Sequence, residues 1–505
     1  MKDNIAEQSK DSKDNLILPP NHGGGQANSS SVFSASNIQY GISERIAGLN
    51  CGGIGAVHTL VKKIGLDETI DQNIHLLKIH NPYRESDHIL NIIYNILCGG
   101  HCLEDLELLR NDEAYLKALG AFRIPDPTTA GDFLRRFECD DVVKLMSVGN
   151  HINQKVWDLD PANKKRSAII DPDGTIAETY GECKEQMDMS YKGKWGFSPL
   201  SIMEAQTGAH LFLVNRSGNA VSHEGAAPWM DKAIDVVKDH FAGVYLRGDS
   251  DFSLTEKFDE WDGKDVKFCF SYDAHPNLVK KAEMLPKNVW KSHNRKERRI
   301  KTVPRGRKHN VKEEVVKKRG YENKKREREY VAEFGYSPVK CDREYRIVVI
   351  RRVLKVTRGR LRFEDEVRYF FHITNIEREE MSAGDVVRFN RGRCNHENKI
   401  EQLYNGVRAL KMPCSEFVAN WAYMVICSLA WNLKSWMGQV MPDRKRGEEV
   451  IRMEFRRFMR VMINIPCQIL KSGRRLWFRI LNWSPWTDTF RDTFRRIKDM
   501  RFAPY

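Results

Sequence analysis

The sequence predicts an α/β protein in which a helical N-terminal domain precedes a mixed sheet and a β-rich insertion interrupts that sheet. Two short apolar segments that end in aspartates, with a hairpin signal and a helical period between them, predict the sheet. A run dense in Lys and Arg, followed by two more apolar segments, predicts the insertion. The chain has 505 residues, more than one ordinary core holds, so we expect several domains.

The composition is that of a globular protein with a polyanionic partner. Hydrophobic residues make up 41% of the chain and charged residues 30%, and the net charge of +14 favours nucleic acid. The polar N-terminus lacks a signal peptide and the eleven cysteines include no CxxC pair, so we expect a cytoplasmic protein. Cys98, His101 and Cys102 lie close together, but no second half of a tetrahedral zinc site accompanies them.

The N-terminal part is expected to contain a tail and a helical domain. Residues 1–40 are rich in Asn, Ser and Gly and lack apolar periodicity, which predicts a disordered tail. Residues 41–150 predict a helical domain for DNA binding or dimerisation. Within it, we expect Ser86 to cap a helix whose buried face carries Ile89 and Ile93.

Residues 160–264 predict the first part of the mixed sheet. Residues 168–170 form a short buried strand that ends in acids, and residues 200–206 and 210–216 flank the turn signal Thr207-Gly208. An amphipathic helix over 226–241 and a strand over 244–246 follow. This order is that of an RNase H-like mixed sheet, in which the first and fourth strands run side by side. That arrangement would bring Asp173 and Asp249 together.

The insertion is expected over residues 265–385. Its first part is dense in basic residues, and we expect Arg305, Arg307 and Lys308 there to contact DNA phosphates. Its second part contains strands over 345–356 and 368–374. A solvated charged surface is the alternative interpretation of the basic run.

Residues 386–440 predict the second part of the core, and residues 441–505 a basic, aromatic region for DNA binding. The apolar stretch 417–433 is at the short limit for a membrane span, and Asn420 and Asn432 interrupt it. We therefore expect a buried helix there and no membrane contact. Ordinary helix packing is the alternative role for the Arg and aromatic residues of the C-terminal region.

Three acidic residues, Asp173, Asp249 and Glu397, are the predicted catalytic residues and metal ligands. Two strand-end aspartates and a helical glutamate can converge on two Mg²⁺ or Mn²⁺ ions, because hard cations prefer oxygen ligands. In a basic chain the natural substrate of such a site is a phosphodiester. Three nearby acids are alternatives to these ligands: Asp171, Asp251 and Glu401.

The segments around these acids resemble those of the DDE transposases of bacterial insertion sequences, over roughly residues 50–440. We refer to the group with a β-rich insertion before the last acid, which is distantly similar to piggyBac-type transposases. The matching segments are Ile170-Asp-Pro-Asp-Gly-Thr175 and Leu246-Arg-Gly-Asp-Ser-Asp-Phe252. Arg393 and Glu397 match the third signature, in which Asn390 and Tyr404 stand where Tyr and Lys are usual.

This resemblance implies an RNase H-like catalytic core and cut-and-paste transposition. The protein would hydrolyse phosphodiesters at the terminal inverted repeats and join the freed 3′-hydroxyls to target DNA, acting as a homodimer on double-stranded DNA. The resemblance implies DNA contacts by Arg393, Lys399 and Tyr404, and a nucleoid-associated location in a bacterial cytoplasm. A metal-dependent DNA endonuclease of the same fold, or an inactive domesticated DNA-binding protein, is the alternative.

Overall fold

The computed structural model describes residues 47–293, 310–358, 361–363, 365–473 and 475–501. Residues 47–505 form one compact unit. The predicted tail and the predicted phosphate contacts Arg305, Arg307 and Lys308 lie outside the described residues, as do the side chains of residue 362 and residues 394–397. The predicted domain boundaries stay predictions.

Helices occupy most of the chain between Ile54 and Trp157, as the apolar periodicity indicates. These helices are α1 (Ile54–Ile64), α2 (Leu66–Asn73), α3 (Glu85–Leu97), α4 (Leu106–Arg110), α5 (Glu113–Leu119), α6 (Pro127–Leu134) and α7 (Cys139–Trp157), followed by the 3₁₀ helix η1 (Pro161–Lys165). The prediction that Ser86 caps α3 is wrong. The N-cap is Arg84, two residues earlier, where the Asp87 carboxylate accepts the Arg84 backbone N–H at 2.9 Å, and the Ser86 hydroxyl donates to Asp71 instead.

A large mixed sheet occupies the middle of the chain, in the order β10-β11-β12-β14-β9-β8-β2-β6-β7, with β13 paired to β12. Its strands are β2 (Ala168–Gly174), β6 (Leu200–Glu204), β7 (His210–Val214), β8 (Val244–Gly248), β9 (Val266–Tyr272), β10 (Lys291–Ser292), β11 (Glu322–Tyr336), β12 (Tyr345–Arg358), β13 (Leu361–Arg362) and β14 (Glu366–Thr374). A smaller sheet contains β3 (Ala177–Glu178), β5 (Trp195–Phe197) and β4 (Asp188–Met189).

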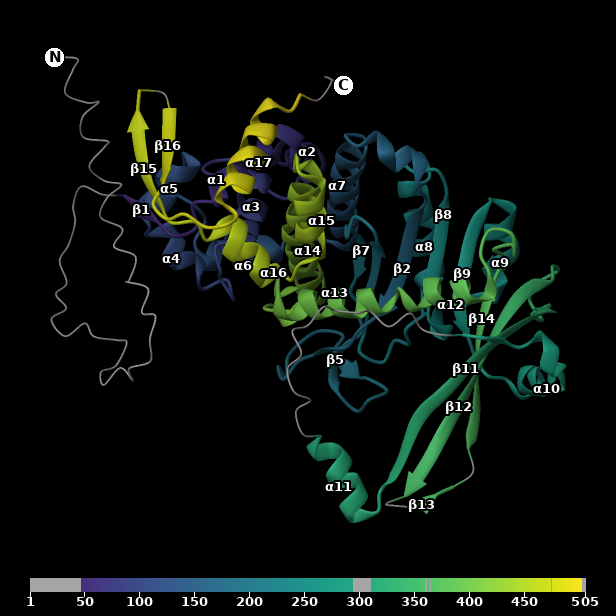
Figure 1. The fold of residues 1–505 in the computed structure, drawn as a ribbon. Coiled ribbons are helices and arrows are strands. Elements are labelled where there is room, and N and C mark those ends of the chain that lie inside the picture. The colour runs from purple at the N-terminus through teal and green to yellow at the C-terminus, as the bar shows by residue number, and fades with distance from the viewer. Residues whose placement is uncertain (1–46, 294–309, 359–360, 364, 474, 502–505) are drawn as a thin grey trace, which may run out of the picture. The chain divides into compact units, whose positions relative to one another are not determined.

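The pairing in the centre of the large sheet confirms two sequence predictions. Strands β6 and β7 form the expected antiparallel hairpin, and Gly208 in its turn has a φ of 74°, which favours glycine. Strand β2 pairs in parallel with β8, so the first and fourth strands of this region do run side by side (Figure 1). The RNase H-like assignment itself stays a prediction.

Helices pack against both faces of the sheet. The helices of this region are α8 (Ala226–Val237), α9 (Thr255–Gly263), α10 (Pro276–Met284), α12 (Ala383–Arg391) and α13 (Cys394–Asn405), with short 3₁₀ turns η2 (Ser250–Phe252), η3 (Lys287–Val289) and η4 (Ala409–Lys411). Phe258 of α9 stacks on Phe268 of β9 with ring centroids 4.3 Å apart. Cys269 points to the opposite face, because strand side chains alternate, and packs with Val386 and Val387 of α12.

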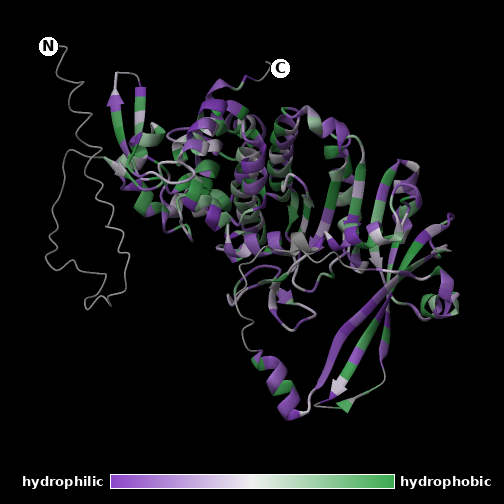
Figure 2. Ribbon diagram, in the orientation of Figure 1, coloured by the Kyte–Doolittle hydropathy of each residue, from purple (hydrophilic) through white to green (hydrophobic). Residues whose placement is uncertain are grey.

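The strands of the predicted insertion join the same sheet as the aspartate-bearing strands. Strand β14 pairs with β9 and β12, and β11 and β12 continue as a long antiparallel pair. The sequence prediction of a basic arm missed α11 (Val311–Arg319), a helix with no buried residue that Figure 2 shows as mostly hydrophilic. Its lack of an apolar face explains why periodicity did not indicate it.

The apolar stretch 417–433 lies within α14 (Phe417–Val440), almost all of whose residues are buried. Trp436 of α14 donates to Asn153 of α7 at 2.7 Å, and Trp421 donates to the backbone of Leu213 in β7 at 2.7 Å. The helix therefore joins the helical segment to the sheet, as expected of a buried helix. Nowhere in the described parts of the chain is there a helix with the length and hydropathy to cross a bilayer.

The C-terminal region forms helices and a hairpin. Its elements are α15 (Arg444–Arg452), α16 (Phe455–Phe458), the π-helical turn η5 (Met459–Ile463), β15 (Cys467–Ser472), β16 (Arg475–Ile480) and α17 (Thr487–Asp499). Strand β15 pairs with β16 and with β1 (Gly48–Leu49), so both ends of the compact unit contribute to one three-stranded sheet.

Candidate active site

A buried ion pair joins the two strands that carry the predicted metal ligands. Arg247 of β8 donates to both carboxylate oxygens of Asp171 in β2, with Nε 2.8 Å from Oδ1 and Nη2 2.6 Å from Oδ2. Asp171 is 2% exposed and Arg247 6% exposed. Such a bidentate pair fixes the relative position of two neighbouring strands, because both hydrogen bonds require the same alignment.

Asp173 and Asp249 stand at the carboxyl ends of these two neighbouring parallel strands. Strands β2 and β8 pair Ala168 with Val244 and Ile170 with Leu246. The pairing of these strands ends at Ile170 and Leu246, and the hydrogen bonds between Asp171 and Arg247 extend the contact by one more residue along each strand. If the same register continued for two further residues, Asp173 would stand opposite Asp249, at a strand spacing of about 4.8 Å that shared cations can span. The approach of these two carboxylates stays a prediction.

Asp249 combines a half-buried carboxylate with a nearby positive charge. Its Oδ1 accepts the backbone N–H of Asp251 at 3.1 Å, and its Oδ2 lies 3.9 Å from Nη1 of Arg393. Burial raises the pKa of the Asp249 carboxyl, and the charge of Arg393 opposes that rise. A cation close to this carboxylate would therefore stabilise its charged form.

The end of α12 is anchored to the same strands. Besides Asp171, Arg247 donates to the Phe389 carbonyl oxygen at 2.9 Å, and its guanidinium lies 5.1 Å from the centroid of the Phe389 ring. Asn390 donates to the carbonyl oxygens of Gly248 and Cys269 at 3.2 Å each. At Gly392 any side chain would collide with this anchor, since a Cβ there would lie 2.3 Å from Nη1 of Arg247.

This anchor positions the start of α13, which carries Glu397. Arg393 is the N-cap residue of α13, so its 3.9 Å approach to Asp249 brings the first turns of the helix towards that carboxylate. The Glu397 side chain lies outside the described residues. Lys399 donates to the Ala205 carbonyl oxygen at 2.9 Å, and burial lowers the pKa of its ammonium group. Tyr404 is 39% exposed.

The structure separates the alternative acids from the predicted ones by their surroundings. Both carboxylate oxygens of Asp171 accept hydrogen bonds from Arg247. Asp251 is exposed and follows Asp249 in the turn η2, where its backbone N–H rather than its carboxylate contacts Asp249. Glu401 is exposed and lines a cavity of ≈ 1190 Å³ together with Lys399 and Arg247. The DNA contacts of Arg393, Lys399 and Tyr404 stay predictions.

The donor chemistry at Asp173 and Asp249 fits a hard divalent cation. Both are carboxylates, and oxygen ligands are what Mg²⁺ and Mn²⁺ prefer. Across the described side chains, no three His, Cys, Asp or Glu residues gather closely enough to hold a metal ion. The Glu397 side chain is not among them, so the predicted trio stays a prediction.

Sequence reasoning missed His372, a buried histidine on β14, the strand next to β9. His372 of β14 pairs with Ser271 of β9, and the register of β8 with β9 continues from Ser271 to Asp249. In the described part of the chain neither ring nitrogen of His372 has a hydrogen-bond partner. Burial, followed by the charges of Arg391 and Arg393, lowers the pKa of His372 to about 3. No local sequence signal marks this histidine, because its position depends on the pairing of β14 with β9.

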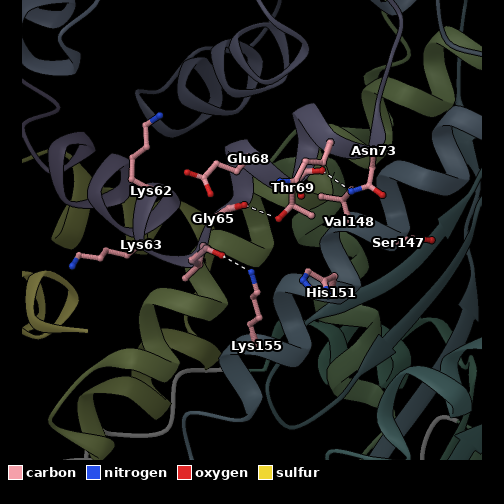
Figure 3. Close-up of a pocket in the computed structure, with 12 residues that line it drawn as sticks. Lys62, Lys63, Gly65, Glu68, Thr69, Asn73, Ser147, Val148, His151 and Lys155 are labelled. Carbon is pink, nitrogen blue, oxygen red and sulfur yellow. Dashed lines mark hydrogen bonds between the residues drawn. The ribbon is translucent and has the colours of Figure 1, made fainter. Parts of the chain in front are cut away.

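A second cavity, of ≈ 660 Å³, lies in the helical segment and lacks the predicted acids. Figure 3 shows Lys62, Lys63 and Lys155 around it, with Lys155 donating to the Ile64 carbonyl oxygen at 3.5 Å and Thr69 donating to Gly65 at 2.7 Å. Lys62 pairs with Asp67, and Lys63 donates to the Met500 carbonyl oxygen. The charged side chains that line the cavity are mainly cations, so it does not match the predicted metal chemistry.

Comparison with known proteins decides the family. A family model described as transposase DDE domain group 1 matches residues 50–502. The chain belongs to this DDE transposase family. Membership supports a function in transposition and an activity on DNA, and it confirms the resemblance seen in the sequence.

The chain was also compared with curated proteins and with solved structures. No curated protein matches this family member. Among solved structures, it matches the cryo-EM structure of a piggyBac transposase synaptic complex with hairpin DNA, at 11% identity and a TM-score of 0.33, over 90% of this chain and 87% of that one.

We predict that Arg247→Met destabilises the protein by about 3–5 kcal/mol, because it leaves the buried Asp171 carboxylate without a counter-charge. The double variant Asp171→Leu/Arg247→Met removes both charges and should recover a large part of that loss. Urea unfolding of the wild type, both single variants and the double variant measures the coupling. An Arg247→Met protein as stable as the wild type would contradict the role of the ion pair.

We predict that His372 makes the protein less stable in mild acid. Its folded-state pKa of about 3 lies below the ordinary value of 6.5, so the unfolded chain binds more protons between these pH values and stability falls as pH falls. From pH 7 to pH 5 this group should cost about 2 kcal/mol. In His372→Phe the pH dependence of the unfolding free energy should shrink by that amount. An unchanged dependence would show that the pKa of His372 is the same in the folded and unfolded protein, contrary to this prediction.

Proposed function

We propose that this family member catalyses cut-and-paste transposition of an insertion sequence. It would hydrolyse one phosphodiester at each terminal inverted repeat and then transfer the freed 3′-hydroxyl to a phosphodiester of target DNA. The observation that carries the proposal is that Asp173 and Asp249 stand at the carboxyl ends of two neighbouring parallel strands, and that Arg393, at the start of the helix that carries Glu397, lies 3.9 Å from Asp249. Family membership and the net charge of +14 support DNA as the substrate.

In the proposed site, the three carboxylates Asp173, Asp249 and Glu397 hold two Mg²⁺ or Mn²⁺ ions. When bound, such ions would activate a water or a 3′-hydroxyl and offset the charge of the phosphate and of the leaving oxygen. The chain itself supplies the alignment: the ion pair of Asp171 and Arg247 holds β2 against β8. In this proposal Arg393, whose Nη1 lies 3.9 Å from Asp249, donates to a phosphate oxygen of the bound DNA.

The proposed partners are double-stranded DNA and a second copy of the chain. A dimer would hold the two ends of one element together, so that both cleavages and both joinings occur in one complex. This part of the proposal comes from the family resemblance and not from a surface of the described residues.

We predict that Asp173→Ala, Asp249→Ala and Glu397→Gln each lower metal-dependent nicking by at least about 100-fold, or about 2.7 kcal/mol of transition-state stabilisation. The assay uses DNA that ends in the repeats flanking the gene, with Mg²⁺ or Mn²⁺, and follows nicking at the repeat boundary and joining to a second duplex. Asp251→Asn and Glu401→Gln are matched controls, which alter the alternative acids and should retain activity.

The outcomes separate the candidate functions. Nicking without joining would identify a metal-dependent endonuclease. Repeat binding without nicking by any form would identify a DNA-binding protein that has lost activity. If Asp173→Ala nicked and joined DNA like the wild type, the proposed site would be wrong.

A further inference from the structure

The β15–β16 hairpin is fixed to the helical segment through one of its two faces. Ile469 and Cys467 of β15 are buried, and β15 also pairs with Gly48 and Leu49 of β1. Phe478 of β16 packs on α1 so closely that a Cβ at Gly55 would lie 2.6 Å from its ring. The inner face is therefore occupied, and the hairpin is held as a rigid element.

The outer face of the same hairpin presents a tryptophan between two arginines. Side chains alternate along a strand, so Arg475, Trp477 and Arg479 of β16 share the face opposite Phe478. All three are exposed, and Trp477 is 56% exposed. Trp483, in the loop that follows β16, is 69% exposed. The outer face of β16 therefore combines a large exposed aromatic side chain with two exposed cations.

The charge of this hairpin is uncompensated, unlike that of the other basic strands. Every charged residue between Glu454 and Asp488 is an arginine or a lysine. In the described part of the chain, neither Arg475 nor Arg479 forms an ion pair. The basic strands β11 and β12 differ, because their cations pair with nearby carboxylates, as Lys324 does with Glu366 and Arg352 with Glu329. The hairpin therefore keeps its full attraction for a polyanion.

A second copy of the chain fits this surface less well than DNA does. Antiparallel pairing of β16 with its own copy, centred on Trp477, would set Arg475 of one chain opposite Arg479 of the other. Like charges directly opposite one another destabilise a strand pair. DNA instead offers phosphates to both arginines and an aromatic or sugar surface to Trp477.

We propose that the outer face of the β15–β16 hairpin, formed by Arg475, Trp477 and Arg479, is a DNA-binding surface separate from the aspartates of the active site. The inference rests on the proposed function for the identity of the polyanion. The two arginines bind phosphates, and Trp477 packs against the nucleotides between them.

The test is equilibrium binding of the full-length protein to a fluorescent duplex that ends in the flanking repeat, without divalent metal, as a function of salt. Each phosphate contact contributes about 0.9 to the slope of log K against log salt, so Arg475→Gln/Arg479→Gln should make the slope less steep by about 1.8. Trp477→Ala should weaken binding by roughly tenfold with an unchanged slope. Lys78→Gln/Lys280→Gln, which removes two exposed lysines elsewhere, should leave both quantities unchanged.

The outcomes distinguish this inference from the proposed function. The arginine double variant could bind DNA with the wild-type affinity and slope and still nick repeat DNA with Mg²⁺. That result would overturn the hairpin surface but would not contradict the proposed active site. Wild-type protein that neither binds nor nicks repeat DNA overturns both. A variant that loses only dimerisation, measured by sedimentation, overturns the inference by identifying the hairpin as a protein interface. Thermal unfolding near the wild-type midpoint confirms that each variant folds.

Discussion

The buried ion pair between Asp171 and Arg247 is the interaction on which the rest of the candidate site depends. Removing two charges from water is costly, and here the cost is offset by two hydrogen bonds to one carboxylate and a third to the Phe389 carbonyl oxygen. In return, one guanidinium ties β2, β8 and the end of α12 together. Without it, the strand pair that leads to the two proposed metal ligands would lose its one bidentate side-chain link among the described residues.

The proposed metal ligands lie at the ends of secondary-structure elements. Asp173 and Asp249 lie at the carboxyl ends of two neighbouring parallel strands, the edge at which open α/β sheets usually place their sites. Asn390 and Arg247 hold the α12–α13 junction over that edge, so the glutamate-bearing helix begins next to Asp249. The conformation at Gly392 completes the arrangement, because a side chain there would displace the guanidinium.

Local patterns in the sequence were sufficient for β2, β6, β7, β8, β12 and β14, the Thr207-Gly208 hairpin and the buried helix α14, because periodicity and turn chemistry are local properties. They did not indicate β9 or the charged strand β11. They could not distinguish Asp171 from Asp173, which project from the same face of β2, because the difference lies in a partner 76 positions along the chain. The cap was wrongly assigned to Ser86 because its hydroxyl is hydrogen-bonded to Asp71, a residue outside the helix. Helix α11 was missed because it has no apolar face.

The most direct test of the account is Mn²⁺ binding, followed by electron paramagnetic resonance, to wild-type protein and to Asp173→Asn, Asp249→Asn and Asp251→Asn. The account predicts saturable binding that both of the first two substitutions weaken by at least about tenfold, or about 1.4 kcal/mol, while Asp251→Asn binds like the wild type. Equal Mn²⁺ binding by the wild type and Asp249→Asn, with both proteins folded, would contradict a metal centre shared by the two strands.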